Sequence, residues 1–340
     1  MPVTNKRVIS IIIFILVIIA VLAAILAFPR QTPPINENGS SDSSTTFAKG
    51  VSLSPKSYNA SDFTDFFLKA EQAGTIVSWA GDWNDLSNKN GGSSVVASLS
   101  STYGYDAAIV LQFFQQTNGS LLRPLDNNTM QTYKDSAVSF AEKYKPKYLA
   151  IGIEINILFE KAPTDFDTFT NFYKDVYDGV KVQSPETKIF PIFQLETMKG
   201  LNGGLFGGVN DQSKSEWALL DRFPKMDFVA ITTYPGLIYK NPSEIPAGYY
   251  SEIKQHTSKP VSFIEIGWHS NASPAGWESS NTEQAQFVTF FFNLTSGLNK
   301  EIAIWSFLYD QNTTEPFNSM GLWTVNDQAK PAWNIWINKK

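Results

Sequence analysis

The feature that most constrains the fold of this 340-residue chain is a regular alternation of strand-like and helical patterns. Eight apolar runs rich in β-branched and aromatic residues stand out, at residues 47–54, 75–83, 106–115, 148–156, 188–196, 228–236, 260–268 and 301–310. Most are almost continuously apolar, which is typical of parallel strands covered on both faces. Eight strand–helix units in about 290 residues predict a (β/α)8 TIM barrel.

The segments between these runs carry helical spacing with recognisable ends. One helix is expected to begin near Ser61 or Asp62 and to stop at Gly74, with an apolar stripe formed by Phe63, Phe66, Phe67 and Ala70. Similar spacing predicts helices within residues 130–144 and 166–180, and a last helix at about 328–338. A doubly wound open sheet is the alternative. It lacks support because no glycine-rich phosphate-binding turn follows the first run, which continues as Ser52-Leu53-Ser54-Pro55.

The N-terminal region has a different composition. Residues 8–28 are uninterruptedly apolar and could cross about 30 Å of hydrocarbon as a helix. Because Lys6 and Arg7 precede them, residues 1–7 are expected in the cytoplasm and the remainder outside. An uncleaved transmembrane signal anchor is favoured over a cleavable signal peptide, since the apolar run is long and Ile25-Leu26-Ala27 is a poor cleavage site. Residues 29–46 read as a flexible linker, and residues 47–340 as the folded domain.

Composition excludes several functions. The chain has no cysteine, so disulfides and thiolate metal sites are excluded, and its two histidines, His256 and His269, are too few for a histidine-rich metal site. No metal or cofactor is therefore expected. A net charge of −5 argues against nucleic-acid binding. Glycosylation sequons at Asn38, Asn59, Asn118, Asn127, Asn271, Asn293 and Asn312 fit an outward-facing glycoprotein, although the motif is weak.

Two of the apolar runs each contain one glutamate, Glu154 and Glu265. An ionised carboxylate in such surroundings costs several kcal/mol unless it is paired, hydrogen-bonded or protonated. Either residue alone could be a half-exposed structural glutamate at the end of a strand. Two such residues on separate strands favour a catalytic pair, in which different surroundings separate the two pKa values.

In a TIM barrel the active site lies at the C-terminal ends of the strands. The ends of the eight runs supply acids, amides and aromatic rings, and no Lys or Arg. Acids and amides bind hydroxyl groups, and indole rings stack on the apolar faces of sugars. The candidate substrate-binding residues are Trp79, Asp82, Gln112, Asn156, Gln194, Glu196, Tyr234, Trp268 and Trp305.

These residues also resemble a known group. Ile151-Gly152-Ile153-Glu154 resembles the acid/base strand of clan A glycoside hydrolases, and Phe263-Ile264-Glu265-Ile266-Gly267-Trp268-His269-Ser270 resembles their nucleophile strand. The likeness is greatest to endo-β-glucanases, endo-β-galactanases and some β-mannanases. It implies that Tyr234 touches the nucleophile and that Trp305 lies under a sugar. One position departs from the pattern, because Ile153 replaces an asparagine that usually binds the sugar 2-hydroxyl.

The resemblance implies a retaining glycoside hydrolase with Glu154 as acid/base and Glu265 as nucleophile. With the anchor, it predicts a cell-surface enzyme that contacts the lipid bilayer and acts on a β-linked oligo- or polysaccharide. The alternative is a non-catalytic glycan-binding barrel at the cell surface. Carboxyl groups about 5–5.5 Å apart are expected for retention, against about 6.5–9.5 Å for inversion.

Overall fold

The computed structural model describes residues 47–339. The predicted N-terminal segment, anchor and linker (residues 1–46) lie outside the described part of the chain. Within the described residues, no helix has both the length and the apolar character needed to cross a membrane.

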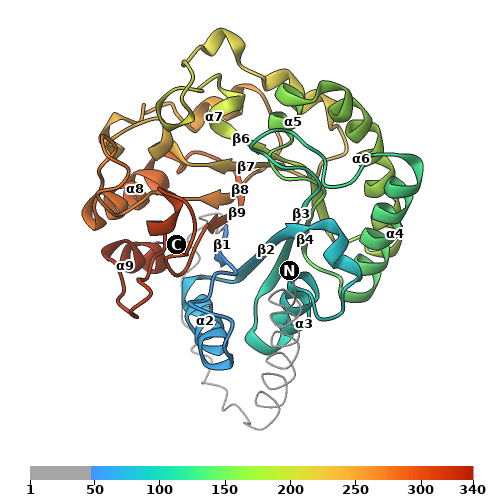
Figure 1. The fold of residues 1–340 in the computed structure, drawn as a ribbon, viewed down its shortest axis with the longest axis horizontal. Coiled ribbons are helices and arrows are strands. Elements are labelled where there is room, and N and C mark those ends of the chain that lie inside the picture. Colours follow the sequence, from blue (N-terminus) through green and yellow to red (C-terminus); the bar gives the residue numbers. More distant parts are fainter. Residues whose placement is uncertain (1–46, 340) are drawn as a thin grey trace, which may run out of the picture.

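All strand pairs of the sheet are parallel, and their order around it is β5-β4-β3-β2-β1-β9-β8-β7-β6. The strands are β1 (Ala48–Ser52), β2 (Ile76–Asp82), β3 (Asp106–Gln112), β4 (Tyr148–Ala150), β5 (Lys188–Phe190), β6 (Ile192–Gln194), β7 (Val229–Thr233), β8 (Val261–Ile266) and β9 (Lys300–Trp305). Because β1 pairs with β9, the first and last strands close one side of the ring, as Figure 1 shows.

Nine strands form an eight-stranded barrel because β5 and β6 are two halves of one run. Pro191 lies between them and has no N–H to donate, so the hydrogen-bond ladder is interrupted there. The chain still pairs on both sides of the proline: Ile151 N donates to Phe190 O at 3.0 Å, and Ile192 N donates to Gly152 O at 2.9 Å. Since β5 pairs with β4 and β6 with β7, the predicted (β/α)8 barrel is confirmed.

Helices surround the strands (Figure 1). The α-helices are α2 (Ala60–Ala73), α3 (Gly92–Tyr103), α4 (Asn127–Tyr144), α5 (Ile155–Lys161), α6 (Pro163–Gln183), α7 (Leu195–Met198), α8 (Asn281–Leu294) and α9 (Pro331–Asn338). The 3₁₀ helices are η1 (Trp83–Ser87), η2 (Gly204–Phe206), η3 (Gln212–Lys214), η4 (Trp217–Arg222), η5 (Pro235–Leu237), η6 (Pro242–Glu244), η7 (Ser251–Gln255) and η8 (Phe317–Ser319).

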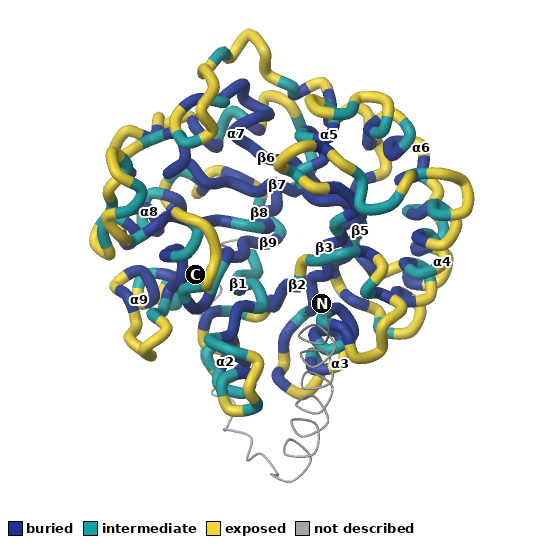
Figure 2. The backbone as a smooth tube through the Cα atoms, in the orientation of Figure 1, coloured by how far each residue is buried: buried dark blue, intermediate teal, exposed yellow. Residues whose placement is uncertain are grey.

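The helical segments expected at 61–73, 130–144, 166–180 and 328–338 correspond to α2, α4, α6 and α9. Burial explains their registers. In α2 the buried residues are the predicted apolar stripe with Ala73, and the helix ends at Gly74. Figure 2 shows the general pattern, with buried strands inside a ring of helices whose outer faces are exposed.

The outer layer is irregular between β6 and β8. After α7, short 3₁₀ turns occupy the connections on both sides of β7, where a regular barrel would have long helices. Glycines crowd the first connection, at positions 200, 203, 204, 207 and 208, and prolines at 235, 242 and 246 interrupt the second. Both residue types disfavour helix interiors, which accounts for the short turns.

Candidate active site

Glu154 lies in a tight turn after β4 and not on the strand itself. The predicted run 148–156 leaves the strand conformation after Ala150, and α5 begins at Ile155. Two left-handed residues make the turn: Gly152 has φ 141°, and Glu154 has φ 53° and ψ 43°. A non-glycine residue in this region costs on the order of 1 kcal/mol. Glu154 remains partly exposed, while Ile153 and Ile155 beside it are buried.

Glu265 lies inside β8, and a local irregularity sets its position. Ile231 pairs with Phe263 while Thr232 pairs with Glu265, so β8 gains one residue relative to β7 between these pairs. Such bulges re-aim side chains and are over-represented near active sites. Glu265 is partly exposed although its neighbours Ile264 and Ile266 are buried.

Three consecutive residues at the end of β7 each direct a hydroxyl group at a different carboxylate. The oxygen–oxygen distances are 2.7 Å from Thr232 to Glu154 Oε1, 2.8 Å from Thr233 to Glu196 Oε1, and 2.5 Å from Tyr234 to Glu265 Oε2. Within the described residues, no hydrogen bond reaches Glu154 Oε2 or Glu265 Oε1. Each of these two carboxyl groups therefore has one oxygen fixed by β7 and one without a partner.

The electrostatics of the two carboxyl groups differ. Burial, and then the negative charge of Glu265, raises the pKa of Glu154 to about 8, against the opposing effect of the Thr232 hydrogen bond. Burial also raises the pKa of Glu265, and the hydrogen bond from Tyr234 opposes that rise. Each carboxyl group has one donor that supports its ionised form, but neighbouring negative charge adds to the rise only at Glu154. Glu154 is thus the group that holds a proton near neutral pH.

Tyr234 is held in turn by β9. Ser306 Oγ lies 2.8 Å from the Tyr234 hydroxyl and 3.0 Å from the carbonyl oxygen of Ile266. Burial, followed by the charge of Glu265, raises the pKa of Tyr234 well above its ordinary value. The phenol therefore stays neutral and donates to Glu265, as the sequence predicted for this residue.

Glu196 was expected to contact substrate, but it is fully buried and already satisfied. Its Oε1 accepts from the Tyr234 backbone N–H at 3.1 Å and from the Tyr249 hydroxyl at 2.7 Å, besides Thr233. Its Oε2 accepts from Gln194 Nε2 at 2.8 Å. Burial raises the pKa of this carboxyl, and the donors from Tyr249 and Thr233 oppose the rise. Glu196 thus holds the end of β7 in place and leaves no oxygen for a sugar.

The two predicted amides beside it are also occupied. Gln194 is buried, and its Oε1 accepts from the Thr197 backbone N–H at 2.7 Å. Asn156 is fully buried and brackets Gln194, because its Oδ1 accepts from Gln194 N at 2.8 Å and its Nδ2 donates to Gln194 O at 3.1 Å. Both amides brace the end of β6. Asn156 therefore does not replace the sugar contact that Ile153 lacks.

The predicted tryptophan platforms face the helices instead of the barrel end. Trp268 and Trp305 are fully buried, and both pack against Phe287 of α8, with ring centroids 5.1 Å and 6.1 Å away. Trp305 Nε1 donates to the Met320 carbonyl oxygen at 2.8 Å. Trp79 is partly exposed, but its indole Nε1 lies against Gly92 at the start of α3. Trp268 and Trp305 therefore offer no ring face to a sugar, because both are buried between strand and helix, whereas Trp79 keeps some exposure.

Asp82 and Gln112 lie at the C-terminal ends of β2 and β3 and are partly exposed. Asp82 forms a two-pronged ion pair with Arg123, at 2.7 Å and 2.9 Å, and the guanidinium lies 5.0 Å from the centroid of the Trp83 ring. Gln112 Nε2 donates to Gln116 Oε1 at 2.9 Å. Arg123 is not among the sequence-predicted residues, because it belongs to the loop after β3 and not to a strand end.

A small apolar cluster borders Tyr234. Tyr234, Leu237 and Met320 are its buried members, and Leu205, Phe307 and Phe317 are partly buried against them. The Phe317 ring meets the Tyr234 ring edge to face, with centroids 5.2 Å apart. The residues of the cluster come from the loops that follow β6, β7 and β9, so no single sequence motif predicts it.

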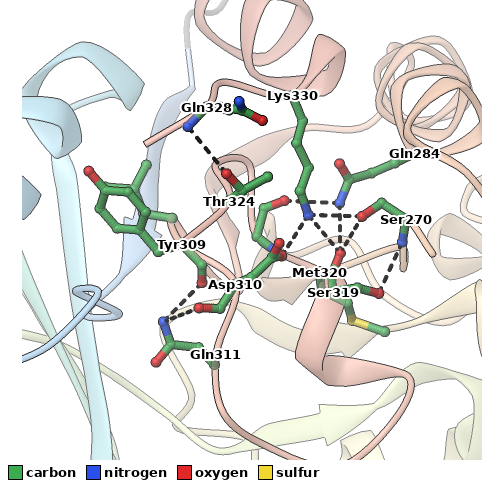
Figure 3. Close-up of polar contacts among 12 residues, drawn as sticks. Ser270, Gln284, Tyr309, Asp310, Gln311, Ser319, Met320, Thr324, Gln328 and Lys330 are labelled. Atoms are coloured by element: carbon green, nitrogen blue, oxygen red, sulfur yellow. Dashed lines mark hydrogen bonds and ion pairs between the residues drawn. The ribbon is translucent and has the colours of Figure 1, made fainter. Parts of the chain in front are cut away.

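Lys330 fixes the loops that carry part of this cluster. Its Nζ lies 2.6 Å from Asp310 Oδ1, 2.8 Å from Ser270 Oγ and 3.0 Å from the Ser319 carbonyl oxygen (Figure 3). Asp310 Oδ1 also accepts from the Gly321 N–H at 2.9 Å. This buried ion pair links the loops after β8 and β9 to the start of α9.

No group of three or more His, Cys, Asp or Glu side chains within residues 47–339 converges as a metal site would require. The chemistry available among the described residues is that of the carboxyl groups and their hydroxyl donors.

No protein-family model matches this chain, and no curated protein sequence does. Solved structures do. A family 39 glycoside hydrolase from Bacteroides cellulosilyticus has a TM-score of 0.58 at 16% identity, over 85% of this chain and 62% of that one. A GH5_18 protein from Bifidobacterium longum, in complex with Manβ1-4GlcNAc, has a TM-score of 0.63 at 15% identity, over 86% of this chain and 77% of that one. An exo-β-1,4-mannosidase from an Opitutaceae bacterium has a TM-score of 0.60 at 12% identity, over 86% of this chain and 58% of that one.

At these identities the likeness shows the fold. It confirms the resemblance expected from the sequence, since the barrel has the architecture seen in clan A glycoside hydrolases. The chain spans about three fifths of the family 39 and mannosidase chains that it matches.

Proposed function

We propose that this barrel, built like those of clan A glycoside hydrolases, is a retaining glycoside hydrolase that acts on a β-linked glycan. The observation that carries the proposal is the pair Glu154 and Glu265. Each has one oxygen held by a hydroxyl group at the C-terminal end of β7 and, among the described residues, one without a partner. Burial, and then the charge of Glu265, raises the pKa of Glu154 to about 8. Glycoside hydrolysis by either mechanism needs one protonated and one ionised carboxyl group. The resemblance of both segments to those of clan A enzymes is what favours retention.

The two groups divide the reaction between them. Glu265, ionised and supported by the Tyr234 hydroxyl, attacks the anomeric carbon, while Glu154 gives its proton to the departing glycosidic oxygen. The products of this step are the leaving alcohol, a glycosyl ester on Glu265 and an ionised Glu154. Glu154 then takes a proton from water as the water attacks the anomeric carbon. The sugar leaves with its original configuration, and both carboxyl groups return to their starting states.

The substrate class rests on two supports. The solved neighbours include a mannosidase and proteins in complex with Manβ1-4GlcNAc. The second support is the partly exposed rim of this barrel, where Asp82, Gln112 and Arg123 can bind hydroxyl groups. β-Mannosides are therefore the first glycans to test, followed by β-glucans, β-galactans and xylans.

The test is a turnover screen of these glycans with wild-type protein and the variants Glu154→Gln and Glu265→Gln. Glu265→Gln should abolish turnover of every substrate, because no glycosyl ester can form. Glu154→Gln should strongly slow the hydrolysis of natural glycans. For aryl glycosides, whose leaving groups need no proton, it should slow the first step only mildly. Azide should rescue the second step of Glu154→Ala and give a glycosyl azide of retained configuration. Near wild-type activity in Glu265→Gln would refute the assignment.

A non-catalytic glycan-binding barrel is the second candidate, and Ile153 favours it. This buried apolar residue precedes Glu154 where clan A enzymes usually bind the sugar 2-hydroxyl, and Asn156 is occupied elsewhere. Binding of a β-glycan in calorimetry without any turnover would select this candidate.

We also propose that the protein is anchored to the cell membrane by residues 8–28, with the barrel outside. The support is the sequence alone: the length of the apolar run and the basic residues before it. Full-length protein should stay in the membrane fraction after carbonate extraction. A mature N-terminus near Phe28 in peptide sequencing would contradict the anchor.

A further inference from the structure

Thr232 holds one oxygen of Glu154 from a place that water does not reach. The residue is fully buried in β7, and its hydroxyl lies 2.7 Å from Glu154 Oε1. This is the single hydrogen bond to the Glu154 carboxyl within the described residues. Glu154 keeps some exposure. Its other oxygen, Oε2, accepts no hydrogen bond from the described residues, which leaves it available to a ligand.

We propose that Thr232 is the positioning residue of the general acid: by donating its hydroxyl to Oε1, it keeps the transferable proton of Glu154 on Oε2. The inference rests on the proposed function for the role of Glu154. It adds a residue to that site, and this residue never touches substrate. A proton on Oε1 would force the Thr232 hydroxyl to turn away and give up its donor role in a fully buried place, which is unfavourable.

The hydrogen bond from Thr232 also affects the pKa of Glu154, together with the charged groups around this carboxyl. Burial raises the pKa of Glu154 most, the charges of Glu265 in β8 and Glu196 in α7 raise it further, and the hydrogen bond from Thr232 lowers it. Tyr234, whose own pKa responds to Glu154, completes the set of titratable groups that interact with this carboxyl among the described residues. An acid that must first release a proton and then recover one works best with a pKa near the operating pH. Thr232 is the side chain that opposes an excessive rise.

The neighbouring Thr233 provides a matched control. It is also fully buried in β7, but its hydroxyl donates to Glu196 at 2.8 Å. Threonine-to-valine substitution removes the same hydroxyl at either position with little change of shape. The loss at 233 weakens the ionised form of Glu196, and less negative charge there lowers the pKa of Glu154. Thr232→Val should therefore raise the pKa of Glu154 and Thr233→Val should not, whereas a general loss of packing would affect this pKa in the same way in both variants.

The experiment is a carboxyl ¹³C NMR titration of the full-length protein labelled at glutamate and solubilised in detergent. Glu154 is assigned by the signal that disappears in Glu154→Gln. Thr232→Val should raise its titration midpoint by roughly 1 pH unit, and Thr232→Ser should restore it. Thr233→Val should leave the midpoint unchanged or lower it. If Thr232→Val does not fold by circular dichroism, Thr232→Ala, which also lacks the hydroxyl, should give the same upward shift.

An unchanged midpoint in folded Thr232→Val or Thr232→Ala would overturn the inference, and so would an equal upward shift in Thr233→Val. The readout needs no substrate, so it separates the two proposals. The expected shift in a protein that turns over no glycan would uphold the contact and refute hydrolysis. With an active substrate, Thr232→Val should also move the alkaline limb of the kcat/KM profile to higher pH by the same amount, because that limb reports loss of the Glu154 proton.

Discussion

At the scale of single residues, the site depends on which side of the sheet each side chain faces. Thr232 and Tyr234 direct their hydroxyls at the two partly exposed glutamates, while Thr233 between them serves the buried Glu196. Alternation along a strand explains this division. The same alternation turns Trp305 toward α8 and its neighbour Ser306 toward Tyr234.

Trp305→Ala should therefore be a stability variant. Removing a fully buried indole between β9 and α8 is expected to lower the free energy of unfolding by about 3–5 kcal/mol. Urea unfolding followed by circular dichroism measures this, with Trp277→Ala as the control. Trp277 is partly exposed, and its loss should cost about 1 kcal/mol or less. Wild-type stability combined with lost glycan binding in Trp305→Ala would return this residue to the substrate site.

At the scale of elements, the turn between β4 and α5 decides where Glu154 lies. Gly152 has φ 141°, and a Cβ atom there would come within 2.9 Å of Ile155, Phe113 and Phe169. Both the backbone angle and the close packing therefore require glycine. The turn also converts what the sequence pattern presents as a strand end into the first residue before a helix.

Gly152→Ala should cost about 2–4 kcal/mol of unfolding free energy, since strain and steric overlap add. Gly104→Ala is the control: Gly104 also has a left-handed angle, φ 70°, but a Cβ there meets nothing within 4 Å. This control should lose about 1 kcal/mol, from backbone strain alone. Equal losses in urea unfolding would show that the packing around Gly152 contributes nothing.

Sequence patterns predicted the elements better than the contacts. Continuous apolar runs identify parallel strands, so the barrel and several of its helices could be anticipated. The contact between Tyr234 and Glu265 was implied only by the family resemblance. Burial of Asn156, Gln194 and Glu196 could not, because the hydrogen bonds that satisfy them join β6, α5 and β7, which are remote in sequence. The Trp268 and Trp305 indoles were misplaced because a strand-end position does not specify the face of the sheet.

At the scale of the whole molecule, the raised pKa values affect stability. Burial and neighbouring charges raise the pKa of Glu154 and of Glu216 to about 8, against about 4.5 for an ordinary glutamate. Between these values the two carboxyl groups bind more protons in the folded protein than in the unfolded chain. Stability therefore falls as pH rises from about 4.5 to 8, and the charged site is maintained at a cost to the fold.

Glu154→Gln should consequently be more stable than wild type at pH 8, by on the order of 1–2 kcal/mol, and the difference should vanish near pH 4.5. The difference is smaller than the full linkage value because solvent screens the partly exposed carboxyl. Urea unfolding at pH 4.5, 6.5 and 8 measures the trend. Glu216→Gln should follow the same trend, because burial and the charge of Glu160 raise the pKa of Glu216 to about 8 as well. A difference that does not change with pH would contradict the raised pKa of Glu154.

The three hydroxyls at the end of β7 also bear on how such a protein can change. Inserting or deleting one residue ahead of Thr232 would exchange inward and outward faces and misdirect three carboxylates at once. An insertion or deletion near one of the rim side chains would displace that side chain alone, since Asp82, Arg123 and Phe317 each belong to a different segment. Laboratory evolution toward another sugar should therefore accumulate changes in the loops. Thr232-Thr233-Tyr234 should stay unchanged, because this segment tolerates no insertion or deletion of a residue.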